Sequence, residues 1–153
     1  DGVDVIETDG SNCMNLPAEA LELEAPIRIN RMSLRKDSGG KGQFRGGLGC
    51  VREIELLEGV ATVTHRGERH NHPPRGSRGG GDGALAYSTI MRTDGSEEII
   101  PSKKLLQMNA GDRLLIQTAG GAGYGDPLER DPQAHQRDIE NGKVSLVEDQ
   151  PTA

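Results

Sequence analysis

The chain has 153 residues, a formal net charge of −6 and three aromatic side chains. The acidic balance excludes a dedicated duplex nucleic-acid binder, which needs a basic face, and no apolar run reaches the roughly 20 residues that cross a bilayer. Leu, Ile, Val and Phe supply only 31 of the 153 residues, so we expect a domain that completes its core against another chain.

The first half of the chain is predicted to hold one helix and three strands. Residues 16–24 favour a helix because Ala, Leu and Glu dominate them. Apolar residues alternate along 27–34 with one slip of phase, which predicts a strand with a β-bulge. Residues 51–57 and 60–65 predict two further strands, and Glu58-Gly59 between them fits a hairpin turn.

The second half is predicted to hold three strands. Residues 84–92 predict a fourth strand and residues 97–100 a short fifth strand, and the two should pair with each other. The four residues that join them, 93–96, have Asp-Gly at their centre, the composition of a tight hairpin turn. Residues 113–118 predict a sixth strand, with Leu114 and Ile116 on one face.

A C-terminal helix is predicted over residues 133–141. Asp131 suits the N-cap position, Pro132 the first helical position, and Gly142 the position after the helix ends. The predicted fold class is therefore mainly β, a sandwich or open barrel with glycine-rich turns and two short helices. We divide the chain into an N-terminal arm with a short helix, a β domain, and a C-terminal helix and tail, which cover residues 1–25, 26–128 and 129–153.

Fifteen of the 22 glycines fall in three clusters, at residues 39–49, 76–83 and 120–125. Such clusters predict tight turns or close approach between backbones. The first cluster is not a phosphate-binding P-loop, because Lys41 lies inside it and no Ser or Thr follows that lysine. We interpret it as a packed glycine turn in which Arg45 bridges nearby backbone or carboxylate groups.

The clusters belong to a longer series of motifs that occur in one order. In chain order these are residues 15–22 (NLPAEALE), 37–49 (DSGGKGQFRGGLG), 51–54 (VREI), Glu68-Arg69, Pro73-Pro74, Gly79-Gly80, Ser102-Lys103, Gly111-Asp112 and 120–127 (GGAGYGDP). The series resembles the C-terminal region of the hydantoinase B/oxoprolinase family, and the resemblance covers nearly the whole chain.

The resemblance implies ATP-driven chemistry on a carbonyl compound. Some members open cyclic amides such as hydantoins or oxoproline, and others carboxylate ketones, as acetone and acetophenone carboxylases do. It also implies larger hydantoinase A-like and hydantoinase B-like partner subunits, with ATP and a divalent metal on those chains and no cofactor on this one. We expect a small, non-autonomous subunit or fragment of a ketone carboxylase such as acetophenone carboxylase, inactive alone. A cyclic-amide hydrolase and a purely structural interaction module are the alternatives.

Residues 65–75 form the densest functional-looking segment, with three of the four histidines. Arginine offers a planar fork to phosphate or carboxylate oxygens, and histidine adds a further donor. The segment therefore predicts a site for an anion such as bicarbonate, carboxyphosphate or a phosphorylated enolate, built from Arg66, Arg69, His70, His72 and Arg75. There are two alternatives. His70 and His72 could share a metal ion, or the segment could be a solvated loop that pairs with acidic groups of a neighbouring subunit. We assign no metal ligand to this chain.

The two cysteines, Cys13 and Cys50, predict reduced thiols in a cytoplasmic protein. The absence of a CxxC pair excludes a ribbon-type zinc site. Cys13 has no base beside it in the sequence, so it is not expected to act as a nucleophile. Glu19 and Glu22 lie three residues apart on the predicted first helix, where they form either a pair of catalytic carboxylates or a solvated face.

Overall fold

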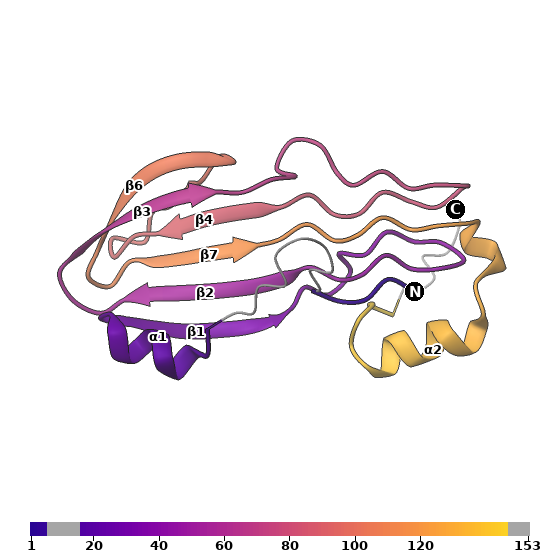
Figure 1. The fold of residues 1–153 in the computed structure, drawn as a ribbon, viewed down its shortest axis with the longest axis horizontal. Helices are drawn as coiled ribbons and strands as arrows, with labels where there is room; N and C mark the ends of the chain where they lie inside the picture. The colour runs from indigo at the N-terminus through magenta and orange to yellow at the C-terminus, as the bar shows by residue number, and fades with distance from the viewer. Residues whose placement is uncertain (6–15, 147–153) are drawn as a thin grey trace.

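The computed structural model describes residues 1–5 and 16–146. The molecule is elongated, with the strands gathered in one half and extended glycine-rich segments in the other (Figure 1). The elements are α1 (Ala18–Glu24), β1 (Ile27–Leu34), β2 (Cys50–Leu56), β3 (Val60–Arg66), β4 (Tyr87–Met91), β5 (Glu97–Ile99), β6 (Lys103–Asn109), β7 (Arg113–Gln117), the short 3-10 helix η1 (Pro127–Glu129) and α2 (Pro132–Glu140). The predicted mainly β fold with two short helices is confirmed, and neither sheet closes into a barrel.

The larger sheet is antiparallel, with strand order β1-β2-β7-β4-β5. The register between β1 and β2 shifts between Ile29 and Arg31, which confirms the predicted bulge. The turn between β4 and β5 is also confirmed, because Gly95 has a φ of +84° and Arg92 N–H donates to the Ser96 carbonyl oxygen over 2.8 Å. Local sequence chemistry therefore determines both irregular points of this sheet.

The smaller sheet pairs β3 with β6, and here one prediction was wrong and one strand was missed. The hairpin expected at Glu58-Gly59 does not form. The chain instead leaves the larger sheet at Gly59, whose φ of +72° suits glycine, and β3 pairs with β6, a strand that we did not predict. Glu58 and Gly59 do change the direction of the chain, but they connect the two layers and do not join paired strands.

The fourth strand begins at Tyr87, three residues later than predicted. The residues before it hydrogen-bond outside the sheet. Ala84 N–H donates to the Ser38 carbonyl oxygen over 2.8 Å, and Ala86 N–H donates to the Arg69 carbonyl oxygen over 2.9 Å. These residues therefore belong to the glycine-rich half of the molecule, where long-range backbone pairing replaces the sheet.

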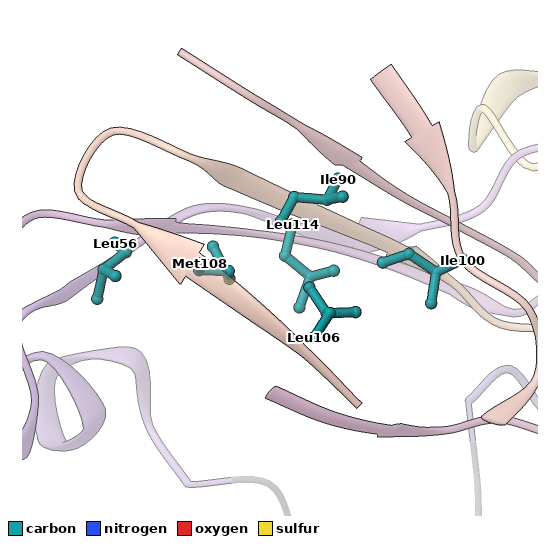
Figure 2. Close-up of a cluster of buried hydrophobic side chains, with 6 residues drawn as sticks. All are labelled: Leu56, Ile90, Ile100, Leu106, Met108 and Leu114. Carbon is teal, nitrogen blue, oxygen red and sulfur yellow. The ribbon is translucent and has the colours of Figure 1, made fainter. Parts of the chain in front are cut away.

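The hydrophobic core lies between the two sheets. Side chains from one face of the larger sheet meet side chains from β6, and Figure 2 shows them pointing toward one another. The buried cluster consists of Leu56, Ile90, Ile100, Leu106, Met108 and Leu114. Helix α1 lies on this same side, where it lines a small hollow together with Ile29 and Met32 of β1. Among the described residues, no helix or strand packs on the opposite face of the larger sheet.

Three extended segments, 38–49, 76–86 and 118–126, form the glycine-rich half. Their backbones hydrogen-bond directly: Gly40 N–H donates to Gly121, and Gly123 N–H donates to Gly81, each over 2.9 Å. A Cβ atom on Gly80 would overlap the carbonyl oxygen of Gly123. Side chains are therefore excluded by space, which confirms the predicted close approach of backbones.

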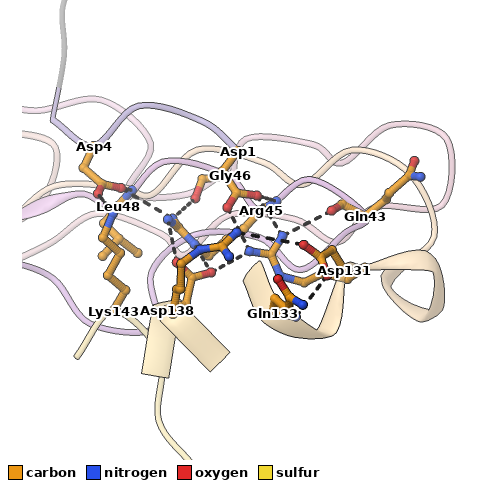
Figure 3. Close-up of polar contacts among 12 residues, drawn as sticks. Asp1, Asp4, Gln43, Arg45, Gly46, Leu48, Asp131, Gln133, Asp138 and Lys143 are labelled. Atoms are coloured by element: carbon orange, nitrogen blue, oxygen red, sulfur yellow. Dashed lines mark hydrogen bonds and ion pairs between the residues drawn. The ribbon is translucent and has the colours of Figure 1, made fainter. Parts of the chain in front are cut away.

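Helix α2 is attached to this half by charged side chains (Figure 3). Its caps are those predicted: Asp131 accepts from Gln133 N–H over 3.0 Å, and Gly142 has a φ of +68°. Arg45 donates to Asp138 on α2 and to the carbonyl oxygen of Gly46, which confirms its bridging role. Among residues 1–5 and 16–146, none of the helices is long and apolar enough to span a membrane. Cys13 lies outside the described residues.

Candidate functional site

The predicted segment 65–75 lies where the two sheets separate. Strand β3 ends at Arg66, and Gly67 N–H then donates to the Ser102 carbonyl oxygen over 2.6 Å. The following loop bends toward the start of β4, where Arg69 accepts from Ala86. A hollow of about 490 Å³ opens at this point, lined by both layers, and its residues include Val63, His65, Arg66, His70, Ser88, Ile116 and Thr118.

His65 forms the inner wall of this hollow and is 7% exposed. Its Nδ1 lies 3.1 Å from the Pro101 carbonyl oxygen, and its Nε2 lies 3.0 Å from Ser88 Oγ. Because a carbonyl oxygen only accepts, Nδ1 donates to Pro101, which leaves Nε2 to share the hydrogen bond with the serine hydroxyl. Our site prediction omitted His65 and Ser88. The alternation along β3, which points Ala61, Val63 and His65 inward, was the signal that could have identified His65.

His70 stands edge-on to His65, with the ring centroids 5.3 Å apart and the planes at 88°. Its Nδ1 lies 3.2 Å from the Glu68 carbonyl oxygen, so this ring too presents Nε2 away from the backbone. That Nε2 atom is buried and has no hydrogen-bond partner among the described residues. Gly67 makes room for both rings, because a Cβ atom there would overlap His70 Cε1 and lie 3.1 Å from His65 Cε1.

The structure separates the five predicted site residues. Arg66 and His70 line the hollow. Arg69 and His72 are exposed, and their side chains make no hydrogen bond or ion pair within the described part of the chain. Arg75 instead forms an exposed ion pair with Asp82, at 3.0 Å, beside the glycine-rich segments. Lys103, which pairs with Arg66 across β3 and β6, adds a further cation near the same end of the hairpin.

The described residues contain no group of three or more His, Cys, Asp or Glu side chains that could hold a metal ion. A metal shared by His70 and His72 would therefore lack a third ligand of these types in residues 1–5 and 16–146. Of the other candidate groups, Cys50 is buried. Glu22 accepts from Ile29 N–H over 2.7 Å, which gives that carboxylate a structural partner.

A second hollow, of about 700 Å³, lies between the glycine-rich half and α2. Arg45, Arg130 and Asp138 line it, but these side chains already bind one another: Asp138 Oδ2 accepts from Arg45 Nε over 3.0 Å and from an Arg130 amino group over 2.6 Å. The buried charges of this hollow are thus satisfied by one another, which indicates a structural role for them. The hollow beside His65 instead holds the buried Nε2 atom of His70, which is unpaired within residues 1–5 and 16–146, and it is the candidate functional site.

The chemistry available at the candidate site is recognition of a small polar molecule. Two imidazoles and hydroxyl groups provide hydrogen bonds, and Arg66 supplies positive charge at the rim. Ser88 and His65 have the hydrogen bond that activates a serine nucleophile, but Ser88 is 0% exposed. This serine therefore orients the histidine and does not itself meet a substrate in the described conformation.

Comparison with known proteins places the chain in a family. The model of the hydantoinase B/oxoprolinase family matches residues 1–127. The B-type polypeptide of a putative D-/L-hydantoinase from Pseudomonas sp. (strain NS671) is 34% identical over 95% of this chain and 25% of the relative. The beta subunit of the caprolactamase from Pseudomonas jessenii is 38% identical over 84% of this chain and 23% of the relative. The chain thus spans about a quarter of the length of these relatives.

Solved structures agree with this comparison. The crystal structure of the ATP-dependent caprolactamase from Pseudomonas jessenii matches with a TM-score of 0.79 and 31% identity, over 95% of this chain and 27% of the other. The nucleotide-free acetone carboxylase matches with a TM-score of 0.69 over 88% of this chain and 22% of the other, and at 24% identity it shows a shared fold alone. The motif series, the fold and these matches agree, and the chain belongs to the hydantoinase B/oxoprolinase family.

Proposed function

We propose that this chain is one part of an ATP-dependent enzyme that opens a cyclic amide. The observation that carries the proposal is the identity of 34–38% to relatives named for hydantoin and caprolactam, across most of the chain. A third relative, 34% identical over 83% of the chain, is the 5-oxoprolinase 1 of Arabidopsis thaliana. All three named substrates contain an amide bond within a ring, so the shared substrate class is the cyclic amide.

The working enzyme, in this proposal, contains hydantoinase A-type and hydantoinase B-type polypeptides. The names of two relatives, each given as one subunit of an enzyme, and the ATP dependence of the caprolactamase support it. We place ATP and any divalent metal on those other polypeptide regions. The part described above contributes a rigid glycine-rich scaffold and the hollow beside His65.

A role for the cationic loop follows from the chemistry of an amide. The amide carbonyl is a poor electrophile, and ATP can activate it by phosphorylating its oxygen, which places negative charge beside the ring. We propose that Arg66 and Arg69 stabilise that charge, with His70 and His72 as further donors and Arg75 at the edge of the loop. Both Arg66 and Arg69 are exposed and have no ion-pair partner in the described part of the chain, which supports this role.

Carboxylation of a ketone, expected from the sequence, remains the second candidate. Its acetophenone-specific form stays a prediction, and the acetone carboxylase shares the fold of this chain. Both reactions begin with a carbonyl compound and ATP, so the two candidate functions are distinguished by their products. A cyclic amide gives a ring-opened amino acid or carbamoyl amino acid, whereas a ketone with bicarbonate gives a β-keto acid.

The test is a product assay on the complete enzyme, purified with every polypeptide that accompanies this chain. Hydantoin, 5-oxoproline and caprolactam are each supplied with ATP, and acetone and acetophenone are each supplied with ATP and bicarbonate. We expect phosphate release that depends on a cyclic amide, together with the ring-opened product by mass spectrometry. Phosphate release and a carboxylated product with a ketone alone would replace this proposal with the second candidate.

A further inference from the structure

On the outer face of the larger sheet, the half that β7, β4 and β5 form carries a group of apolar side chains beside the polar Arg113, Gln117 and Glu97. An antiparallel sheet with one face on a core normally presents polar side chains on the other face. Here Thr89 pairs with Leu115 on β7 and with Ile99 on β5, and Tyr87 and Met91 flank Thr89 on β4. Tyr87, Met91 and Ile99 are 37%, 38% and 65% exposed. We call the group Tyr87, Met91, Ile99 and Leu115 the outer patch.

The other half of the same face has a different character. Along β1 and β2 most outward side chains are charged and form ion pairs, as Arg28 of β1 does with Glu55 of β2 at 4.0 Å. Glu53 of β2 likewise pairs with Arg113 of β7 at 3.4 Å. Those strands follow the normal rule for a solvated face. The outer patch departs from it, and contiguous exposed apolar surface of this kind marks an interaction site.

Arg35 lies at the Tyr87 end of the outer patch. It follows β1 directly, and the alternation along that strand directs it to the same face as Ser33. One terminal nitrogen of its guanidinium donates to the Leu85 carbonyl oxygen over 2.5 Å and to the Thr118 carbonyl oxygen over 3.0 Å. Leu85 stands two residues before Tyr87, so these bonds hold the guanidinium at the beginning of β4.

The charge of Arg35 has no counter-ion among the described residues. The side chain is half-buried, and burial lowers the pKa of its guanidinium. By contrast, the buried Arg45 and Arg130 both bind Asp138. A desolvated cation without a partner carboxylate is costly, and a carboxylate that presents two oxygens to the remaining N–H groups would remove that cost.

We infer that the outer patch and Arg35 together form a docking surface for a protein segment. Its occupant places a carboxylate on Arg35 and apolar side chains on the outer patch, and it comes from the larger polypeptide of the same enzyme. The relatives are about four times as long as the part matched here, so the enzyme contains further polypeptide that could occupy this surface. Because the occupant is assigned to the same enzyme, the inference rests on the proposed function. A free anion would satisfy Arg35 but leave the outer patch bare, so a peptide fits both features.

Photo-crosslinking in the complete enzyme tests this surface. The photoreactive residue p-benzoylphenylalanine replaces Ile99 in the outer patch or, as the matched control, Leu105 on the outward face of β6. The two side chains are similarly exposed, at 65% and 68%. We expect position 99 to yield a crosslinked peptide from the larger polypeptide and position 105 to yield none. An intact enzyme in which position 99 gives no crosslink would overturn the inference while leaving the proposed function standing.

Substitution of Arg35 tests the proposed contact between its guanidinium and a carboxylate of the docked segment. Arg35→Gln should weaken association with the larger polypeptide at least tenfold, and Arg35→Lys should recover part of that loss because it keeps the charge but not the fork. Circular dichroism of each variant monitors folding. If Arg35→Gln fails to fold, a carbodiimide reaction on the assembled Arg35→Lys enzyme decides, since it joins the new amine to a carboxylate in contact. A carboxylate of the larger polypeptide is expected at that crosslink, and its absence overturns the inference.

Discussion

Arg45 and Asp138, 93 residues apart in sequence, face each other in a buried ion pair. Arg45 Nε donates to Asp138 Oδ2 over 3.0 Å, and the two side chains are 5% and 8% exposed. Arg130 donates to the same oxygen over 2.6 Å. Helix α2 has little apolar surface of its own, so this contact between a glycine-rich segment and the helix is what fixes the helix in place.

Removal of the shared carboxylate should be strongly destabilising. Asp138→Ala removes the carboxylate that Arg45 and Arg130 share. It leaves Arg45 with Asp4 at 3.4 Å and Arg130 with Asp1 at 2.7 Å, and we expect a loss of about 2 kcal/mol or more in the free energy of unfolding. The matched control is Arg137→Ala on the same helix, whose ion pair with Asp131 is exposed and 3.9 Å long. That control should cost under about 0.5 kcal/mol. Urea denaturation of both variants measures the difference, and equal losses would contradict this account of α2.

The same carboxylate predicts a dependence of stability on pH. Burial raises the pKa of Asp138, but hydrogen bonds and charges from Arg45 and Arg130 outweigh burial and lower the pKa below its ordinary value of 3.8. The folded state therefore favours the ionised form, and its stabilisation is present above pH 3.8 and is lost as the pH falls through the lower folded value. The pKa values of Asp4 and Asp112 are lowered in the same direction.

Urea midpoints measured between about pH 6 and pH 3 check this prediction. The wild-type midpoint should stay level in the upper part of this range and fall below the ordinary pKa of aspartate. Asp138→Asn should start lower and fall less steeply, because one of the titrating groups is gone. A variant with the same slope as the wild type would show that Asp138 does not contribute.

Two adjacent glycines provide a sharp test of the glycine-rich half. Gly80→Ala would force a Cβ atom into the carbonyl oxygen of Gly123, whereas at Gly81 the nearest atoms lie 3.5 Å away. We expect Gly80→Ala to lower the free energy of unfolding by about 2 kcal/mol or more. Gly81→Ala should be neutral or slightly stabilising, because alanine restricts the unfolded chain. Thermal midpoints decide, and a tolerated Gly80→Ala would refute the close packing of these backbones.

The fold was predictable wherever local chemistry decides the structure. The bulge in β1, the Asp-Gly turn at Gly95 and the caps of α2 each depend on a few neighbouring residues. The predicted hairpin at Glu58-Gly59 was wrong, because a hairpin turn and a crossing between layers use the same residues. The strand β6 was missed although Leu106 and Met108 alternate inward, and its pairing with β3 depends on burial against the other sheet.

The sequence identified the segment that contains the candidate site, but it did not predict which side chains of that segment lie together. Residue types alone identified the loop that carries Arg66 and His70. They gave no reason to separate those residues from Arg75, whose partner Asp82 lies across a turn. Nor could the sequence show that His65 contacts Ser88, since 23 residues and a change of sheet lie between them.

Charge reversal at the cationic loop should affect turnover and not folding. Arg66→Glu and Arg69→Glu place negative charge where the proposed intermediate gains it, so kcat/KM of the complete enzyme should fall at least about tenfold. Arg137→Glu, exposed on the far side of the glycine-rich half, is the control for a change of net charge. Steady-state assays with a cyclic amide and ATP measure the effect, and unchanged turnover in Arg69→Glu would remove the anion site.

We propose that the ATP-driven reaction of the complete enzyme requires this part of the assembly. The most direct measurement compares phosphate release, with and without a cyclic amide, by hydantoinase A-type and B-type polypeptides that carry this chain and by the same polypeptides lacking it. We predict that the cyclic amide stimulates phosphate release only when the chain is present. Equal stimulation in its absence would contradict the account.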